Sequence, residues 1–512
     1  MKARGRFGYH ESQDSMKSPK LSSEARFPAP IYAETVLAIN FEDAKRHFLE
    51  AFIEIHYAHT LMLSRQGIIS AADAAACLRG LAHLNRPEIA ATAYDGTCED
   101  LFFHLEEKLA ACCGPDTAGR MHTARSRNDI DLTLYRMALR REVLKIADAV
   151  ASVRWQLLHM AAAHLDTIMP GYTHTQPAQP TTLGHYLMAA VEFLGRDFQR
   201  LQSAFATVNR SPLGACAITT TGFPINRDYT ARLLGFEGLQ LNSYGAIAAV
   251  DYLTESVSAV AVAMVNLGKL VQDLLMWCTK EFGFLRLPDG YVQCSSIMPQ
   301  KRNPVALEHT RILASKALGQ AQAILTAAHN TPFGDIVDSE DDLQPLVFSV
   351  FADAERALRL FAGVMTNAEV DCERLARLAN DSFLTVTELA DTLVRGENLS
   401  FRAAHHLVSE AVRMVGPVYS ADRMVEEVEH LAPAVLGHRL SVSRQELRRA
   451  LDADNFVRVR AIPGGPAPES VTAQIETARG ELAAFAAWLE EKQQLLRRYP
   501  ELIQEAVDAV VK

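Results

Sequence analysis

The sequence lacks several signatures that would place it in a familiar class. It has no Gly-rich phosphate loop, no internal repeat and no low-complexity block, so it does not match a nucleotide-binding or repeat architecture. Its 51 lysines and arginines are outnumbered by 61 aspartates and glutamates, and this net charge of −10 excludes a basic field for nucleic acid. The eight cysteines form no CxxC pair, which disfavours a structural zinc site or a disulfide framework and fits a reducing cytoplasm.

A secretory or membrane-spanning segment is also missing from the sequence pattern. Residues 1–30 are polar, without the apolar core that a signal peptide needs, and they predict a flexible N-terminal arm. The most apolar stretch, VSAVAVAMVNLGKLVQDLLMWC from Val257, is interrupted by polar residues such as Asn266, Gln272 and Asp273. It predicts a fully buried helix and not a membrane span. We therefore expect a soluble, cytoplasmic protein with no membrane or nucleic-acid partner.

Strand-like alternation is scarce, and helical periodicity dominates. Apolar residues recur at three- and four-residue spacing over 41–67, 132–166, 183–208, 251–282 and 304–328. The best strand candidate is the short CAITTTGFPI at 216–225. Because the central segments exceed the usual globular helix of about a dozen residues, they predict an all-α fold with an extended bundle.

Breaks in the periodicity, near 114–120 and at 330–345, divide the chain into helical parts. The predicted organisation is an arm (1–30), an N-terminal helical domain (31–120), a central long-helix bundle (121–375) and a C-terminal helical domain (376–512). The last domain contains VRAIPGGPAPESV, a Pro/Gly turn that precedes a helical tail.

Three polar islands interrupt the helical pattern. They are HTARSRNDID (the first island, 122–131), GYTHTQPAQP (the second, 171–180) and CSSIMPQKRNP (the third, 294–304). Each sets small hydroxyl or amide side chains beside a cationic or titratable group. Arg127 can hold a carboxylate through two parallel hydrogen bonds, and His174 can exchange a proton.

Each island also has a purely structural interpretation. Ser126 or Asp129 can cap a helix, and His174 can be a hydrogen-bonded structural histidine. Lys301 can belong to a solvated patch ahead of a helix that starts near Pro304. The combination nevertheless favours a ligand, because three donor-rich islands without matching acidic partners suit an anion, most simply a dicarboxylate.

In order and wording, the islands resemble the signature regions of the aspartase/fumarase superfamily, most closely those of argininosuccinate lyase. HTARSRND is similar to HTGRSRND of that family, GYTHTQPAQP to GYTHLQRAQP, and SSIMPQKRNP to SSIMPQKKNP. The similarity continues through YDGTCEDLFFHLEEKL, DSFLTVTELADTLVRGENLSFRAAHHLV and GGPAPESV, so it covers nearly the whole chain after the arm. It implies a three-domain fold with a long central helical bundle as a tetramer core, and it calls for no metal or organic cofactor.

The resemblance also implies a reaction. Family members remove a proton from the carbon beside a carboxylate and expel an amine, which leaves fumarate. Ser295 is then the base, and Lys301 stabilises the doubly negative carboxylate. His174, paired with Glu308, helps to protonate the departing amine. The residues matched to binding of the succinyl carboxylates are Ser126, Arg127, Asn128, Thr173, Gln176, Ser296 and Asn303.

Chain geometry bears on assembly. Ser126 and His174 are 174 − 126 = 48 residues apart, and a helix of that length would span about 70 Å. One chain therefore cannot easily join the islands, and family members build each active site from three subunits. We expect a homotetramer with D2 symmetry and shared active sites.

Departures from the family pattern fall in the half of the site that would receive arginine. Phe102 stands where the family has the histidine of EDxH, and Phe52 aligns with an aspartate. The segment DIVDSEDDL (335–343) aligns with a family loop that resembles YNKDLQEDK. In this alignment the tyrosine, glutamine and lysine of the family loop are replaced by Asp335, Glu340 and Leu343. The succinyl half is intact, whereas this leaving-group half differs.

Three functions stay open. The first is a fumarate-releasing lyase whose amine is not arginine, with ethylenediamine-N,N'-disuccinate and related aminopolycarboxylates as the best candidates. The second is an argininosuccinate lyase of arginine biosynthesis, in which the departures are ordinary drift. The third is an idle structural homologue like the lens delta-crystallins, against which the intact catalytic set argues.

Overall fold

The computed structural model describes residues 27–512, so most of the predicted arm lies outside the described residues. Two compact units divide the chain: Met1–Thr123 with Val507–Lys512, and Ala124–Ala506. The predicted border at residue 375 falls inside the second unit, and the three-domain division stays a prediction.

The first unit is helical. Its elements are α1 (Pro30–Tyr32), the π-helical turn η1 (Ala33–Leu37), α2 (Ala38–His47), α3 (Leu49–Arg65), α4 (Ala71–His83), α5 (Arg86–Ala91), α6 (Leu101–Cys113) and α7 (Pro115–Arg120). The predicted helix at 41–67 is interrupted at Phe48, whose φ of −125° leaves the helical region and separates α2 from α3. Helices α4 and α6 approach closely at Gly80, where a Cβ would lie 2.8 Å from Leu109 Cδ1.

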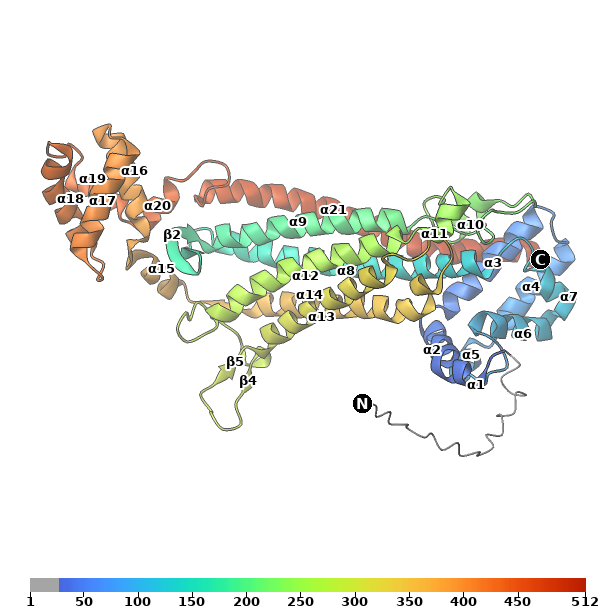
Figure 1. Ribbon diagram of the computed structural model, residues 1–512. Helices are drawn as coiled ribbons and strands as arrows, with labels where there is room; N and C mark the ends of the chain where they lie inside the picture. Colours follow the sequence, from blue (N-terminus) through green and yellow to red (C-terminus); the bar gives the residue numbers. More distant parts are fainter. Residues whose placement is uncertain (1–26) are drawn as a thin grey trace, which may run out of the picture. The chain divides into compact units, whose positions relative to one another are not determined.

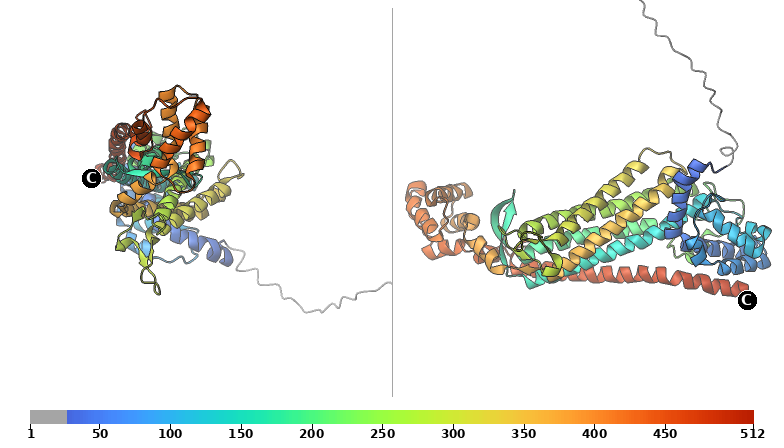
Figure 2. Two further views of the ribbon diagram at one scale, coloured as in Figure 1. Left: turned by 90° about the vertical axis from the view of Figure 1, so that its left-hand side faces the viewer. Right: turned by 90° about the horizontal axis from the view of Figure 1, so that it is seen from below.

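Five long helices form the core of the second unit. They are α8 (Arg127–Ala163), α9 (Leu183–Val208), α12 (Asp251–Trp277), α13 (Val305–Ala328) and α14 (Gln344–Asn367). Helix α8 packs against α9 and α14, and α12 packs against α9 and α13, so the five lie side by side (Figures 1 and 2). Helix α21 (Pro468–Val511) runs along α9, where Phe485 stacks on Phe198 at 4.0 Å between ring centroids. The predicted all-α bundle is confirmed.

Short elements connect these helices. They are β1 (Ile168–Thr173), β2 (Gln176–Thr182), α10 (Arg227–Leu233), α11 (Ser243–Ala248), β3 (Leu285–Arg286), η2 (Asp289–Tyr291), β4 (Gln293–Cys294), β5 (Arg302–Asn303), η3 (Val337–Ser339), η4 (Asp341–Leu343), β6 (Glu369–Val370), α15 (Cys372–Asn380), η5 (Phe383–Thr385), α16 (Val386–Glu397), α17 (Phe401–Val415), α18 (Ala421–Leu436), α19 (Arg444–Ala450) and α20 (Ala453–Arg458). The strands pair as three antiparallel ribbons, β1–β2, β3–β6 and β4–β5.

The prediction of a strand at 216–225 is wrong. This segment forms turns and irregular structure. Cys216, Ala217 and Thr220 have φ of 48°, 67° and 59°, which is left-handed and incompatible with an extended strand. The run of β-branched residues Ile218 to Thr221 resembled a strand, but the segment turns beside the start of α8, where Cys216 N–H donates to Asp129 Oδ2 at 3.2 Å.

Helix α12 was predicted to be fully buried, and this is wrong for one of its sides. Val262 and Val265 are 39% and 45% exposed, although the opposite side packs against α9, α13 and α14. Its polar residues join neighbouring helices: Asn266 Nδ2 donates to Asp197 Oδ2 at 3.0 Å. Within residues 27–512, α12 is the one helix whose length and composition would allow a membrane span. Its packing is that of a bundle helix.

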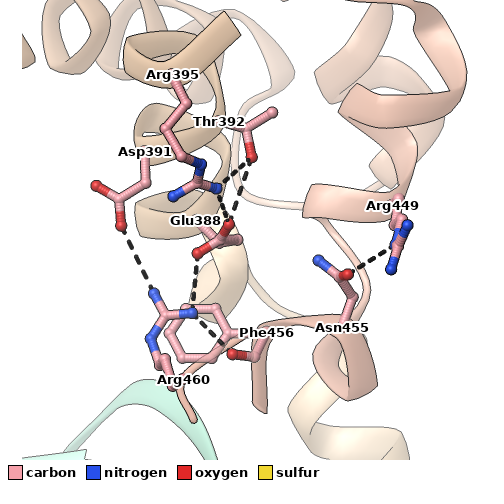
Figure 3. A network of polar contacts seen from close by, with 8 residues as sticks. All are labelled: Glu388, Asp391, Thr392, Arg395, Arg449, Asn455, Phe456 and Arg460. Carbon is pink, nitrogen blue, oxygen red and sulfur yellow. Dashed lines mark hydrogen bonds and ion pairs between the residues drawn. The ribbon is translucent and has the colours of Figure 1, made fainter. Parts of the chain in front are cut away.

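Helices α16 to α19 enclose a separate apolar cluster, with Leu389, Leu407 and Leu447 among its buried members. A polar network adjoins it (Figure 3). The buried carboxylate of Glu388 pairs with Arg395 and, at 2.9 Å, with Arg460 Nη1. The Arg460 guanidinium also lies over the Phe456 ring. Because a buried charge is costly without partners, this network fixes α20 against α16.

Buried arginines fix the ends of two helices against α8. Arg136 Nη1 donates to the carbonyl of Thr207 at 2.9 Å, in the last turn of α9. Arg140 Nη2 donates to the carbonyl of Leu234 at 2.7 Å, and its Nη1 donates to Asn209 Oδ1 at 2.9 Å. The last carbonyls of a helix lack partners within the helix, and a cation there also interacts favourably with the helix dipole. These arginines therefore set where α9 and α10 end.

Replacing Arg140 with methionine should lower the free energy of unfolding by about 2–4 kcal/mol, because it leaves buried carbonyl groups without donors. The measurement is urea denaturation at fixed protein concentration. Arg196→Met removes an exposed arginine paired with Glu192 on α9 and is the matched control, with an expected change below about 0.5 kcal/mol. Equal midpoints for Arg140→Met and the wild type would contradict this role.

Candidate active site

The first island begins helix α8. Ser126 is the N-cap residue: its N–H donates to Asp129 Oδ1 at 2.8 Å, and its Oγ donates to Asn128 Oδ1 at 2.6 Å. The capping interpretation therefore describes the local structure. It does not exclude a ligand, because the start of a long helix carries partial positive charge and Arg127 and Asn128 lie in its first turn.

Asp129 joins the first island to the segment around Gly214 through hydrogen bonds to backbone N–H groups. Its side chain is buried, and Oδ2 accepts hydrogen bonds from the N–H groups of Gly214 at 2.7 Å and Cys216 at 3.2 Å. Burial raises the pKa of Asp129, while these backbone donors oppose the rise. Ala124 has a φ of 60°, the left-handed conformation in which glycine is favoured, and it stands where the family motif has glycine.

The second island is the β1–β2 hairpin. Thr173 pairs with Gln176, which leaves His174 and Thr175 as a two-residue turn with φ of 50° and 61°. This is the pattern of a type I′ turn, which usually takes asparagine and glycine, so His174 holds a strained backbone conformation. Thr173, His174 and Gln176 are exposed at the tip.

The third island is a loop between β4 and β5. Ser295 Oγ accepts hydrogen bonds from the N–H groups of Ile297 at 3.3 Å and Met298 at 3.1 Å. Two donors on one hydroxyl oxygen favour its anionic form, as a serine base requires. Ser296 and Lys301 are exposed, and Asn303 is half-buried.

The islands lie at two ends of the bundle. Ser126 starts α8 and the hairpin follows its other end, so the 37 residues of α8 separate them by about 56 Å (Figure 1). The third island lies at the same end of the bundle as the hairpin (Figure 1), and the ring of Phe282, in the segment that follows α12, is 5.9 Å from that of Tyr172. Glu308 is exposed in the first turn of α13. Within residues 27–512, no hydrogen bond or ion pair joins it to His174.

Acidic residues gather near Arg127. Burial raises the pKa of Glu340 to about 8, its hydrogen-bonded neighbour Asp335 adds to the rise, and the charge of Arg127 opposes it. Asp341 Oδ1 accepts a hydrogen bond from Tyr135 Oη at 2.6 Å. The prediction from sequence missed Asp341 and Tyr135. The acidic run DSEDD was a visible signal, but its tyrosine partner lies 206 residues away.

The other predicted leaving-group residues are buried. Phe52 and Phe102 belong to the first unit, with ring centroids 6.4 Å apart, and both are almost inaccessible. Two histidines flank Phe102: the rings of His56 and His122 lie 5.8 and 5.6 Å from it. Leu343 is buried at the end of η4 in the second unit. Among residues 27–512, no group of three histidine, cysteine or acidic side chains is arranged to hold a metal ion.

Comparison with known proteins gives consistent matches. Family models described as lyase and argininosuccinate lyase C-terminal match residues 66–319 and 383–458. Argininosuccinate lyase 2 of Agrobacterium fabrum is 42% identical over 474 residues, 92% of this chain and 94% of its own. The argininosuccinate lyase of Methanoculleus marisnigri is 39% identical over 466 residues, 91% and 94% of the two chains. A crystal structure of EDDS lyase in complex with formate has a TM-score of 0.82 and 35% identity, covering 92% and 93%.

Glu340 should make stability depend on pH. Between pH 4.5 and about 8 the folded chain keeps a proton on Glu340 that the unfolded chain releases. The contribution of this carboxyl group to the free energy of unfolding is therefore complete below pH 4.5 and declines as pH rises to about 8. Glu340→Gln keeps a neutral side chain and should flatten this decline, which melting temperatures between pH 5 and pH 8.5 would detect. The exposed Asp342→Asn is the control and should keep the wild-type slope. An unchanged slope in Glu340→Gln would contradict a raised pKa for the half-buried Glu340.

Proposed function

Because this chain belongs to the argininosuccinate lyase family of the aspartase/fumarase superfamily, we propose that it releases fumarate from a succinylated amine other than argininosuccinate. The chain is a fumarate-forming carbon–nitrogen lyase that acts on a small dicarboxylate. The proposal concerns the leaving amine and the assignment of roles to residues. We name aminopolycarboxylates such as ethylenediamine-N,N'-disuccinate as the substrate class.

Ser295 is the proposed base. Its Oγ already accepts two backbone N–H groups, which would stabilise the alkoxide that removes the proton beside the carboxylate. Lys301 and Asn303, at the other end of the same loop, would hold the carboxylate that takes up negative charge. Ser296, Thr173 and Gln176 would bind the succinyl group from the same end of the bundle.

His174 is the proposed group that returns a proton to the departing amine, with Glu308 as its partner. Its strained turn supports this role, because strained backbone is retained where the surrounding structure or function requires it. Ser126, Arg127 and Asn128 would complete the succinyl site. They lie a whole helix away from His174 in the same chain, so we propose that other subunits supply them.

A homotetramer built on the central helices would meet that requirement. The exposed apolar residues Val262 and Val265 on α12 and Ile312 on α13 support the packing of these helices against another copy. Two-fold symmetry would then place the first island of one subunit beside the second or third island of another.

The acidic group at Asp335, Glu340 and Asp341 carries the proposal for the leaving amine. An arginine leaving group brings an α-carboxylate that Leu343 cannot pair. The amine that leaves ethylenediamine-N,N'-disuccinate also carries carboxylates, so the acidic group supports the proposal only through the second nitrogen of the diamine unit. A diamine brings a second ammonium that these oxygens can accept. The alternative is argininosuccinate lyase itself, and the relatives at 42% and 39% identity that carry this name favour it.

Purified protein given fumarate should consume it faster with ethylenediamine than with arginine at equal concentration. Each polar end of arginine left unpaired costs about 1–3 kcal/mol, so the ratio of rates should exceed about 100-fold. Loss of fumarate absorbance is the measurement, and Ser295→Ala is the blank. Leu343→Lys is a matched variant that should lower the ratio of the rate with ethylenediamine to the rate with arginine. Arginine reacting at least as fast would favour argininosuccinate lyase.

Shared active sites should permit complementation. Ser295→Ala and His174→Asn should each be nearly inactive, yet mixed and reassembled subunits should regain part of the activity, because some sites would then contain neither change. The measurement is fumarate formation after subunit exchange is verified by native mass spectrometry. Continued inactivity of verified mixed oligomers would assign each site to one chain.

A further inference from the structure

The two-stranded ribbon β4–β5 at the base of the Ser295 loop is too small to be stable on its own. Strands β4 and β5 form two residue pairs, Gln293 with Asn303 and Cys294 with Arg302. Gln293, Cys294 and Arg302 are exposed, so the ribbon has no apolar face buried against the bundle. Short isolated two-stranded ribbons are at best marginally stable in water. Another interaction must fix the base of this loop.

Arg302 supplies that interaction. Its Nη1 donates to Asp289 Oδ1 at 2.5 Å, and its Nη2 donates to the carbonyl of Leu287 at 2.8 Å. The two outer nitrogens of one guanidinium thus join β5 to the segment that precedes β4. Lysine, with a single nitrogen, cannot reproduce this fork.

Leu287 is a firm point of attachment. Its side chain is buried, and the two residues before it form strand β3, in which Leu285 pairs with Val370 and Arg286 with Glu369 of β6. The carbonyl of Phe284 accepts a further hydrogen bond from the N–H of Asp371 at 3.0 Å. Through Leu287, Arg302 therefore ties the exposed loop to the packed end of the bundle.

We propose that Arg302 is a positioning residue for the elimination, one that holds the base of the Ser295 loop and sets which way its neighbours face. Successive side chains along a strand alternate between its two sides. With Arg302 turned toward Leu287 and Asp289, Asn303 occupies the opposite side of β5, and the register keeps Cys294, next to Ser295, across from Arg302. The inference rests on the proposed function of this loop and adds a residue that does not touch substrate.

Kinetics separate positioning from substrate binding. Arg302→Met should lower kcat about 10- to 100-fold while KM changes less than threefold, because the misplaced loop would affect the reacting geometry more than ground-state binding. Arg302→Lys should recover only part of the loss. Asp289→Asn, whose side chain is 88% exposed, should lower kcat about three- to tenfold. The double variant should be no worse than Arg302→Met, since both changes break one interaction.

Arg359→Met is the control, because it removes another exposed arginine ion pair, with Glu355 on α14, and should leave both constants unchanged. A rise in KM without a change in kcat for Arg302→Met would make Arg302 a substrate ligand and overturn the proposal. Wild-type kinetics for Asp289→Asn would overturn it as well.

A measurement without turnover distinguishes failure of this inference from failure of the proposed function. Trypsin should cleave after Lys301 at least fivefold faster in Asp289→Asn than in the wild type, because the loop sequence is unchanged and only its attachment is weakened. This result would support the attachment even if no tested amine reacted. Equal cleavage rates would contradict it, whatever the activity.

Discussion

The length of helix α8 is the constraint on which the proposed site depends. Its 37 residues place Ser126 and the His174 hairpin at opposite ends of one rigid rod, about 56 Å apart. Buried arginines near the start of the same helix hold the ends of α9 and α10 against it. A dicarboxylate is far smaller than this separation. Any site that uses both islands must therefore draw on more than one chain.

Each island combines that rigid support with a locally unusual backbone. Ala124 and His174 have left-handed φ values, and Ser295 lies in a turn whose amide groups converge on its hydroxyl oxygen. Long helices fix where each island lies, and the tight turns fix how its side chains are presented. This division suits chemistry that needs preorganised donors at a developing negative charge, because little rearrangement then remains for the reaction itself.

The acidic group beside Arg127 places groups of opposite charge at the first island. Arg127 suits an anion, whereas burial and the charges of Asp335 and Asp341 raise the pKa of Glu340 to about 8. A protonated carboxyl can donate a hydrogen bond to a substrate oxygen, and an ionised one can accept an ammonium. The charge of this region therefore depends on pH.

The sequence by itself determined the helical class and the approximate positions of α8, α9, α12 and α13, because their apolar residues recur with the helical period over many turns. It did not place α14, but it located all three islands, since polar residues that interrupt such a pattern are visible without a structure. Periodicity could not show that Phe48 breaks a helix, that residues 216–225 turn instead of forming a strand, or that one side of α12 is exposed. Only the tertiary structure decided that Asp341 meets Tyr135 and that Arg302 donates hydrogen bonds to Asp289 and Leu287, because neither contact leaves a trace in the sequence pattern.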